Sequence, residues 1–182
     1  MSISEEVRNA VVNTIKAGGD VGSALVNAIA EITETALKDT KEVGREAISV
    51  PEEIIAEGIK AAGEVGGAGV DTTQHITTGV VTAVSTSAVD TEEGISHVVE
   101  KAIDTAHQTG GNVGSTAVSA VRGAIDAAKK SGVDVDKATE AAVRGAVKGA
   151  KNIGSDAVNA VAKDVGEGVE GTEGVIKKVL GQ

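Results

Sequence analysis

The chain of 182 residues contains 24 Gly but no Phe, Tyr, Trp or Cys, and its 27 acidic side chains outnumber the 17 basic ones, for a net charge of −10. The lack of Cys excludes disulfide and thiolate chemistry, and the lack of aromatic rings disfavours the compact, pocketed core of a typical enzyme. An acidic chain with no rings to stack on bases is also not expected to bind nucleic acid.

An 11-residue repeat of apolar residues runs along the whole chain. Eleven residues over three turns is 3.67 residues per turn, close to the α-helix, so residues eleven apart share one line of a helix surface. The line that is richest in Val, Ile and Leu and its four neighbouring lines form an apolar face about 130° wide. The sequence therefore predicts an all-α protein of long amphipathic helices. We call the following thirteen residues the apolar stripe and expect them to be its packing or surface-binding face: Ile15, Val26, Leu37, Ile48, Ile59, Val70, Val81, Ile103, Ile125, Val147, Val158, Val169 and Leu180.

Glycine clusters and the single proline divide this repeat-built region of residues 1–182 into helical segments. In chain order, we expect breaks near 18–19, 50–51, 66–69, 110–111 and 132–134. Pro51 and the two acids after it are typical of the first turn of a new helix. These breaks predict four or five helices, packed as an elongated bundle or as hairpins. Because the register never slips between Ile3 and Leu180, an unbroken rod is the alternative.

One line of the repeat carries glycine at every second 11-residue unit except at Ala88, and we call these glycines the alternate-repeat glycines. Small residues four apart, as in Gly145 and Gly149, let two helix backbones approach closely. If helices pair along the apolar stripe, an 11-residue repeat predicts a right-handed coiled coil or nearly straight packing. We expect close helix contacts at the alternate-repeat glycines, which are Gly22, Gly44, Gly66, Gly110, Gly132 and Gly154.

The residues that could carry chemistry form no recognisable site. His75 and His97 are two repeats apart, about 33 Å along one helix, whereas a metal pair on a helix needs a spacing of four. Residues 166–171 match G-x-G-x-x-G, but no strand precedes them and acidic residues lie among them. Asp134 and Asp136 begin like a calcium loop that then lacks its later ligands, and we interpret them as a helix cap. We predict no catalytic residue, no metal and no cofactor.

The repeat, the absence of aromatic residues and the composition of residues 35–42 (Thr-Ala-Leu-Lys-Asp-Thr-Lys-Glu) and 124–130 (Ala-Ile-Asp-Ala-Ala-Lys-Lys) resemble the group 3 late embryogenesis abundant (LEA) proteins. Residues 41–44 and the Val/Gly/Thr-rich stretch 66–89 look more like the synucleins, which also use 11-residue lipid-binding repeats. The resemblance covers the chain as a pattern, and it implies protection of membranes or other macromolecules under stress.

Two function classes follow. Each interior Gly costs a helix about 1 kcal/mol relative to Ala, so these helices need a surface against which the apolar stripe can pack. The first hypothesis is a non-enzymatic, LEA-like stress-protective protein whose helices cover lipid surfaces or client proteins. The alternative is a structural, self-associating protein that forms a bundle, rod or filament. Neither a leader-like nor a membrane-spanning segment is visible, so we expect a cytoplasmic location.

Overall fold

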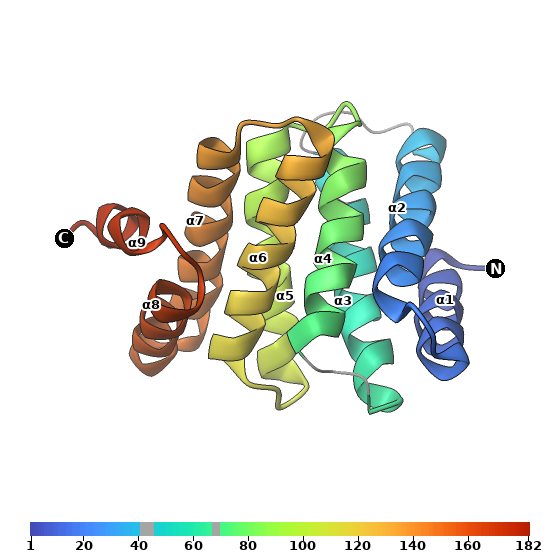
Figure 1. Cartoon of the computed structure of the whole chain (residues 1–182), viewed down its shortest axis with the longest axis horizontal. Coiled ribbons are helices and arrows are strands. Elements are labelled where there is room, and N and C mark those ends of the chain that lie inside the picture. The colour runs from blue at the N-terminus through green and yellow to red at the C-terminus, as the bar shows by residue number, and fades with distance from the viewer. Residues whose placement is uncertain (41–45, 67–69) are drawn as a thin grey trace.

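The computed structural model describes residues 1–40, 46–66 and 70–182, and all regular structure in these ranges is helical, which confirms the predicted all-α class (Figure 1). A short 3-10 helix, Glu46–Ile48, precedes α3. None of the described helices is long and apolar enough to cross a membrane. The helices are α1 (Ile3–Ala17), α2 (Val21–Asp39), α3 (Ser49–Glu64), α4 (Val70–Ser85), α5 (Thr91–Gln108), α6 (Val113–Ser131), α7 (Val135–Ile153), α8 (Ser155–Gly168) and α9 (Glu173–Leu180).

The helices form a bundle of two layers. Consecutive helices alternate between the layers, so each helix packs mainly against the helix two places along the chain. We call α2, α4, α6 and α8 the even layer and α1, α3, α5, α7 and α9 the odd layer. In Figure 1, α2, α4 and α6 lie in front of α3 and α5. The prediction of a bundle is confirmed, and the unbroken rod is wrong because the chain turns back between successive helices.

A unit of one helix and one turn explains how the repeat keeps its register through the turns. Helices α5, α6 and α7 begin at Thr91, Val113 and Val135, so each starts two 11-residue repeats after the one before it. In this part of the chain one helix plus one turn therefore equals two repeats, and α6 and α7 each start in the phase of the helix before. The glycine and proline breaks predict four or five helices, whereas the described residues contain nine.

Polar caps and left-handed glycines define the helix ends. Asp90, Asn112 and Asp134 each accept a hydrogen bond from the backbone N–H three residues on, at the starts of α5, α6 and α7. Gly110 and Gly132 follow α5 and α6 with φ of 74° and 71°, a conformation that other residues rarely adopt.

The structure places several of the expected breaks between helices and adds others. Turns lie at 18–20, 109–112 and 132–134, whereas Pro51 lies inside the first turn of α3. The break expected at 66–69 lies partly outside the described residues. The turn before Asp90 has no glycine, and there hydroxyl groups bond to the carbonyls that end α4, as Ser87 does to Val84 at 2.8 Å.

The alternate-repeat glycines are mostly turn residues and do not lie at close helix contacts. Gly66, Gly110, Gly132 and Gly154 follow helices with positive φ, and a Cβ built at any of them would meet nothing within 4 Å. Gly22 is the exception, because it lies in α2 against the ring of His75 (a Cβ there would be 2.9 Å away). Gly44 lies outside the described residues.

Other glycines make the close contacts within each layer. A Cβ on Gly79 in α4 would lie 2.7 Å from the backbone oxygen of Val26 in α2, and one on Gly123 in α6 would lie 2.5 Å from the backbone oxygen of Gln74 in α4. In the odd layer, Gly145 of α7 approaches the backbone of α5 in the same way. Since only hydrogen fits at such distances, glycine sets the spacing of neighbouring helices.

We expect Gly123→Ala to lower the free energy of unfolding by about 1–3 kcal/mol, although alanine is the better helix former, because its methyl group would overlap the backbone of α4. Gly166→Ala is the matched control. A Cβ there lies 3.6 Å from Ile176, so the gain in helix propensity should stabilise the protein by about 0.5–1 kcal/mol. Urea unfolding followed by circular dichroism measures both, and equal effects of the two changes would contradict this account of the packing.

Candidate functional site

The apolar stripe lies in the core of the bundle. Seven of its residues are buried: Val26, Ile48, Ile59, Val81, Ile103, Val147 and Val169. Five are half-buried and pack against the core: Ile15, Leu37, Ile125, Val158 and Leu180. The side chain of Val70 lies outside the described part. The stripe therefore serves packing within the chain, and the surface left for other molecules is the polar outside of the two layers.

Polar pairs connect neighbouring helices across the outer face of the odd layer, and we call them the charged seam. They are Arg8–Glu64 (2.6 Å), Glu52–His97 (2.8 Å), Glu92–Lys137 (3.7 Å), Glu100–Lys148 (3.2 Å) and Glu140–Lys178 (2.9 Å). Together they link α1 to α3, α3 to α5, α5 to α7 and α7 to α9. The seam thus extends over every helix of the layer.

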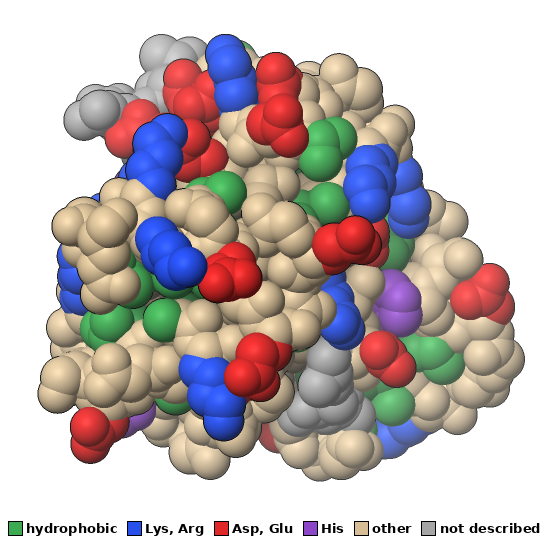
Figure 2. All heavy atoms as spheres, turned by 60° about the vertical axis from the view of Figure 1, so that its left-hand side comes forward, with side chains coloured by type: hydrophobic (Ala, Val, Ile, Leu, Met, Phe, Trp, Pro, Cys, Tyr) green, Lys and Arg blue, Asp and Glu red, His purple; other side chains and the backbone are tan. Residues whose placement is uncertain are grey.

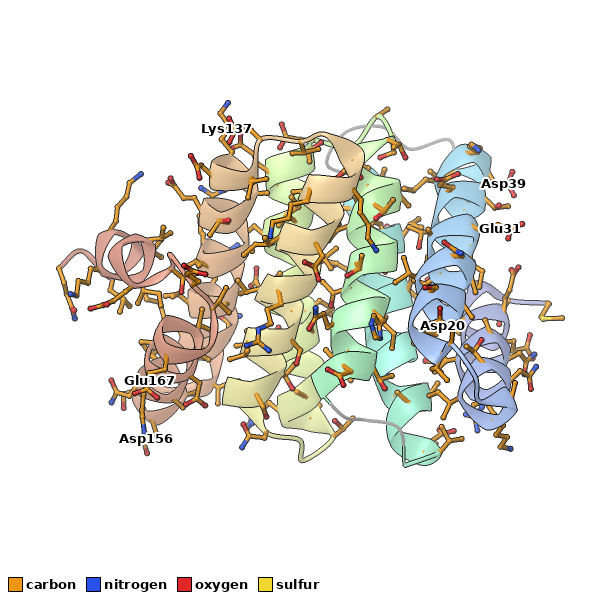
Figure 3. All side chains as sticks on the ribbon, viewed as in Figure 1. Asp20, Glu31, Asp39, Lys137, Asp156 and Glu167 are labelled. Carbon is orange, nitrogen blue, oxygen red and sulfur yellow. The ribbon has the colours of Figure 1, made fainter. Side chains whose placement is uncertain are left out.

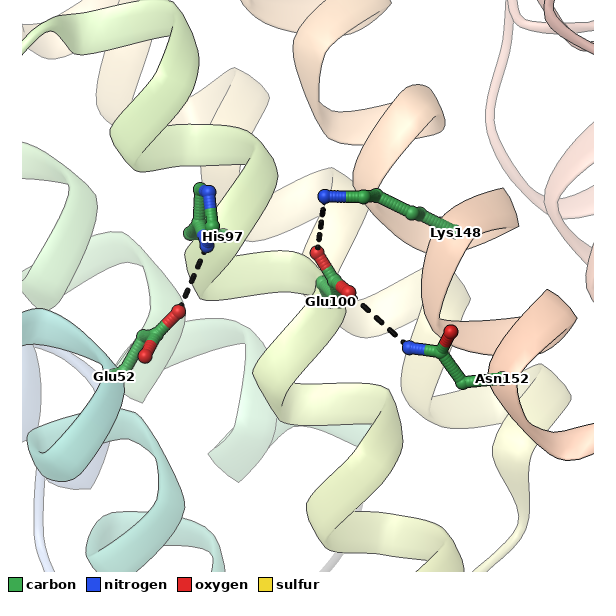
Figure 4. A network of polar contacts seen from close by, with 5 residues as sticks. All are labelled: Glu52, His97, Glu100, Lys148 and Asn152. Carbon is green, nitrogen blue, oxygen red and sulfur yellow. Dashed lines mark hydrogen bonds and ion pairs between the residues drawn. The ribbon is translucent and has the colours of Figure 1, made fainter. Parts of the chain in front are cut away.

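The centre of the seam is the carboxylate of Glu100 on α5 (Figure 4). It pairs with Lys148 and accepts a hydrogen bond from the side-chain amide of Asn152 at 3.2 Å, both from α7. Its side chain is 17% exposed, against 40% for the carboxylate of Glu140 farther along the seam. A charge that is partly withdrawn from water depends more on its partner, so loss of Lys148 should cost more than loss of the partner in an exposed pair.

Asp104 lies one turn beyond Glu100 and is the carboxyl with the clearest electrostatic cost. Partial burial raises its pKa, and the charges of Glu100 and Glu52 raise it further, against the opposing effects of Lys101 and His107. A carboxyl with a raised pKa in the folded state weakens the fold when it is ionised. Asp104 therefore opposes stability at neutral pH.

The other candidate sites of the sequence are not assembled by the fold. His75 lies on α4 of the even layer and His97 on α5 of the odd layer, and among the described residues no group of three or more His, Asp or Glu could hold a metal ion. The G-x-G-x-x-G match spans the end of α8 and the turn at Gly171, with no strand before it. The interpretation of Asp134 as a cap is confirmed, since it accepts from the N–H of Lys137 at 3.1 Å.

The clefts of the described surface are open and lined by scattered polar groups. The largest, about 590 Å³, lies where α3, α5 and α6 end or begin, and Lys60 and Glu64 are its charged residues. Three shallower grooves of about 350, 350 and 310 Å³ lie between neighbouring helices of the odd layer. In Figure 2, hydrophobic side chains appear on the surface only in small separated groups among acids and bases.

The charged seam was not predicted, although the sequence contains a signal for it. If one helix plus one turn spans two repeats and neighbours in a layer are two helices apart, partners should lie about four repeats apart. Glu52 and His97, like Glu92 and Lys137, are separated by 45 residues, one more than four repeats. This spacing could have identified these two pairs once the turns were known, but not Arg8–Glu64 or Glu140–Lys178, which are 56 and 38 residues apart.

We expect Lys148→Met to destabilise the protein by about 1 kcal/mol, because it leaves the carboxylate of Glu100 partly buried without its cation. The matched change Lys178→Met removes an exposed pair and should cost less than about 0.5 kcal/mol. Chemical unfolding at low salt compares the two, and a larger loss for Lys178→Met would refute the ranking.

Asp104→Asn should stabilise the protein at neutral pH by less than about 1 kcal/mol, since it removes an ionised, partly buried carboxyl. The sign follows from linkage: the raised pKa means that the folded state holds the proton more tightly, so stability falls as pH rises above the ordinary value of 3.8. The gain should vanish below that value, where Asp104 is protonated in both states. Thermal melts at pH 7 and about pH 3 test this, and a gain that is independent of pH would contradict it.

No protein family model and no curated protein matches the chain. Three features of the structure bear on the function: an apolar stripe used inside the bundle, open clefts, and a charged outer face on the odd layer.

Proposed function

We propose that this protein is a structural, self-associating helical bundle that acts in the cytoplasm without catalysing a reaction. The observation that carries the proposal is the burial of the apolar stripe. The stripe would be the surface for lipid or client proteins in an extended helix, but here Val81, Ile103 and Val147 are at most 2% exposed. A chain that buries its apolar stripe can contact other molecules only through its outer faces while it stays folded.

The 11-residue repeat has a defined role in this proposal. It sets a spacing of 22 residues from α5 to α6 and from α6 to α7, and glycine contacts such as Gly79 against Val26 bring helices of one layer together. Repeats that contact only their neighbours are typical of extended scaffolds, which present broad faces to other proteins. Self-association through such a face requires no enclosed pocket.

A second candidate is LEA-like protection of membranes or client proteins. The observation that favours it lies at the two ends of the bundle, where Ile15, Leu37, Val158 and Leu180 are only half-buried. If the terminal helices separated from the bundle, these residues would offer an apolar face to a lipid surface. This function requires opening of the fold, whereas the structural function uses the fold as it stands.

Circular dichroism and analytical ultracentrifugation distinguish the two candidates. The structural function predicts a highly helical protein in dilute buffer that melts cooperatively, with a midpoint and a sedimentation coefficient that rise with protein concentration. A chain that is mostly disordered in buffer and becomes helical with anionic vesicles or on drying would overturn it in favour of the protective function. A folded protein that stays monomeric at all concentrations would contradict self-association.

A further inference from the structure

The outer face of the odd layer is divided into two strips of opposite charge. Helix α3 carries four Glu against one Lys, and α5 carries four acids against one Lys. Helix α7 carries four bases against two acids, and the short α9 carries two Lys against one Glu. We call α3 with α5 the acidic strip and α7 with α9 the basic strip. They lie side by side, with the boundary between α5 and α7.

The division is specific to this layer. In the even layer α2, α4 and α8 each carry a net negative charge, and α6, which is net positive, lies between α4 and α8. That face therefore offers no two-strip pattern. In α7 of the odd layer, by contrast, the exposed positions between 141 and 151 are all basic: Arg144, Lys148 and Lys151. A positive surface of this kind stands out in a chain with a net charge of −10.

The charged seam neutralises only part of each strip. Lys148 is paired within the chain, whereas Arg144 and Lys151 make no ion pair with any described residue. On the acidic strip, Glu53 accepts a hydrogen bond from the hydroxyl of Ser4 at 2.8 Å, and neither Glu53 nor Glu57 has a cation among the described residues. Both strips thus keep charge for a partner, and the signs of the remaining charges are opposite.

We propose that this face binds a second copy of the chain in a two-fold dimer, with the acidic strip of each copy on the basic strip of the other. The inference rests on the proposed structural function. A two-fold axis that runs parallel to the helices over the boundary between α5 and α7 exchanges the strips and brings opposite charges together. The perpendicular two-fold axis in the same plane would place acid on acid and base on base. Charge complementarity therefore favours the two-fold axis parallel to the helices, and both copies use the same surface for the contact.

The exposed edge of α2 does not favour end-to-end addition. Gly79 of α4 lets the backbone of α2 approach closely. A further helix that packed on α2 in the same way would meet the residue four repeats before Gly79, which is Thr35 of α2. Thr35 is exposed, so its side chain would hold off a further helix that approached as α2 approaches α4. Glu31 and Asp39 also extend from this edge of the bundle (Figure 3). A polar terminal edge is what ends an array of repeats, and it leaves the broad face of the odd layer as the site of association.

Charge reversal provides the decisive experiment. The double variant Arg144→Glu, Lys151→Glu reverses the basic strip, and Glu53→Lys, Glu57→Lys reverses the acidic strip. None of these four residues belongs to the charged seam. Each variant alone should weaken the dimer about tenfold or more at about 50 mM salt, because like charges then meet twice. An equimolar mixture of the two should restore a dimer, because both contacts again join opposite charges. Ultracentrifugation gives the dissociation constants.

The control is Lys130→Glu, Lys163→Glu, which makes the same change in net charge on exposed residues of the even layer. It should leave the dimer intact, and circular dichroism should show all three variants folded. A dimer that survives both odd-layer variants, or a mixture that stays monomeric, overturns the proposed surface while self-association stands. A wild-type chain that is monomeric at low salt and high concentration overturns the surface and the structural function together.

Discussion

The close contact between glycine and the backbone of a neighbouring helix is the constraint on which the rest of this bundle depends. Gly79, Gly123, Gly145 and Gly149 bring helices of one layer so near that no side chain separates them at those points. The buried core of the bundle consists mainly of Ala, Val and Ile. An aromatic ring, with roughly 150–250 Å² of buried area, would not fit at these glycine contacts, and the chain contains none.

Much of the fold could be predicted from the sequence, but the roles of its glycines could not. Helix class, the buried stripe and the cap at Asp134 follow from local pattern alone. Gly110 and Gly132 end helices, whereas Gly123 and Gly145 lie at contacts, and the members of each pair are two repeats apart. Periodicity therefore does not distinguish a turn glycine from a contact glycine. The difference depends on backbone dihedral angles and on the neighbouring helix, which only the folded chain defines.

The two layers hold their helices together by different polar means. The odd layer uses ion pairs between helices, centred on Glu100. The even layer uses hydrogen bonds between helices. Thr78 of α4 donates to the carbonyl oxygens of Gln74 in its own helix and of Gly123 in α6, the side-chain amide of Gln74 donates to the carboxylate of Asp126 in α6, and Arg122 of α6 donates to the carbonyl oxygen of Gly168 in α8. A hydroxyl that bonds within its own helix is compatible with a close contact, whereas a long charged side chain needs access to water. Most of the charged side chains of the odd layer accordingly lie on its outer face, at positions outside the apolar face of the 11-residue repeat.

The unit of one helix and one turn also determines how the gene for such a protein can change in length. A duplication of one unit would preserve helical phase but move every later helix to the opposite layer, and the contacts between neighbours would be lost. A duplication of two units would preserve the helical phase and keep every later helix in its layer. The two added helices would then pack against neighbours like those already present. Bundles of this design can therefore grow or shrink by whole hairpins.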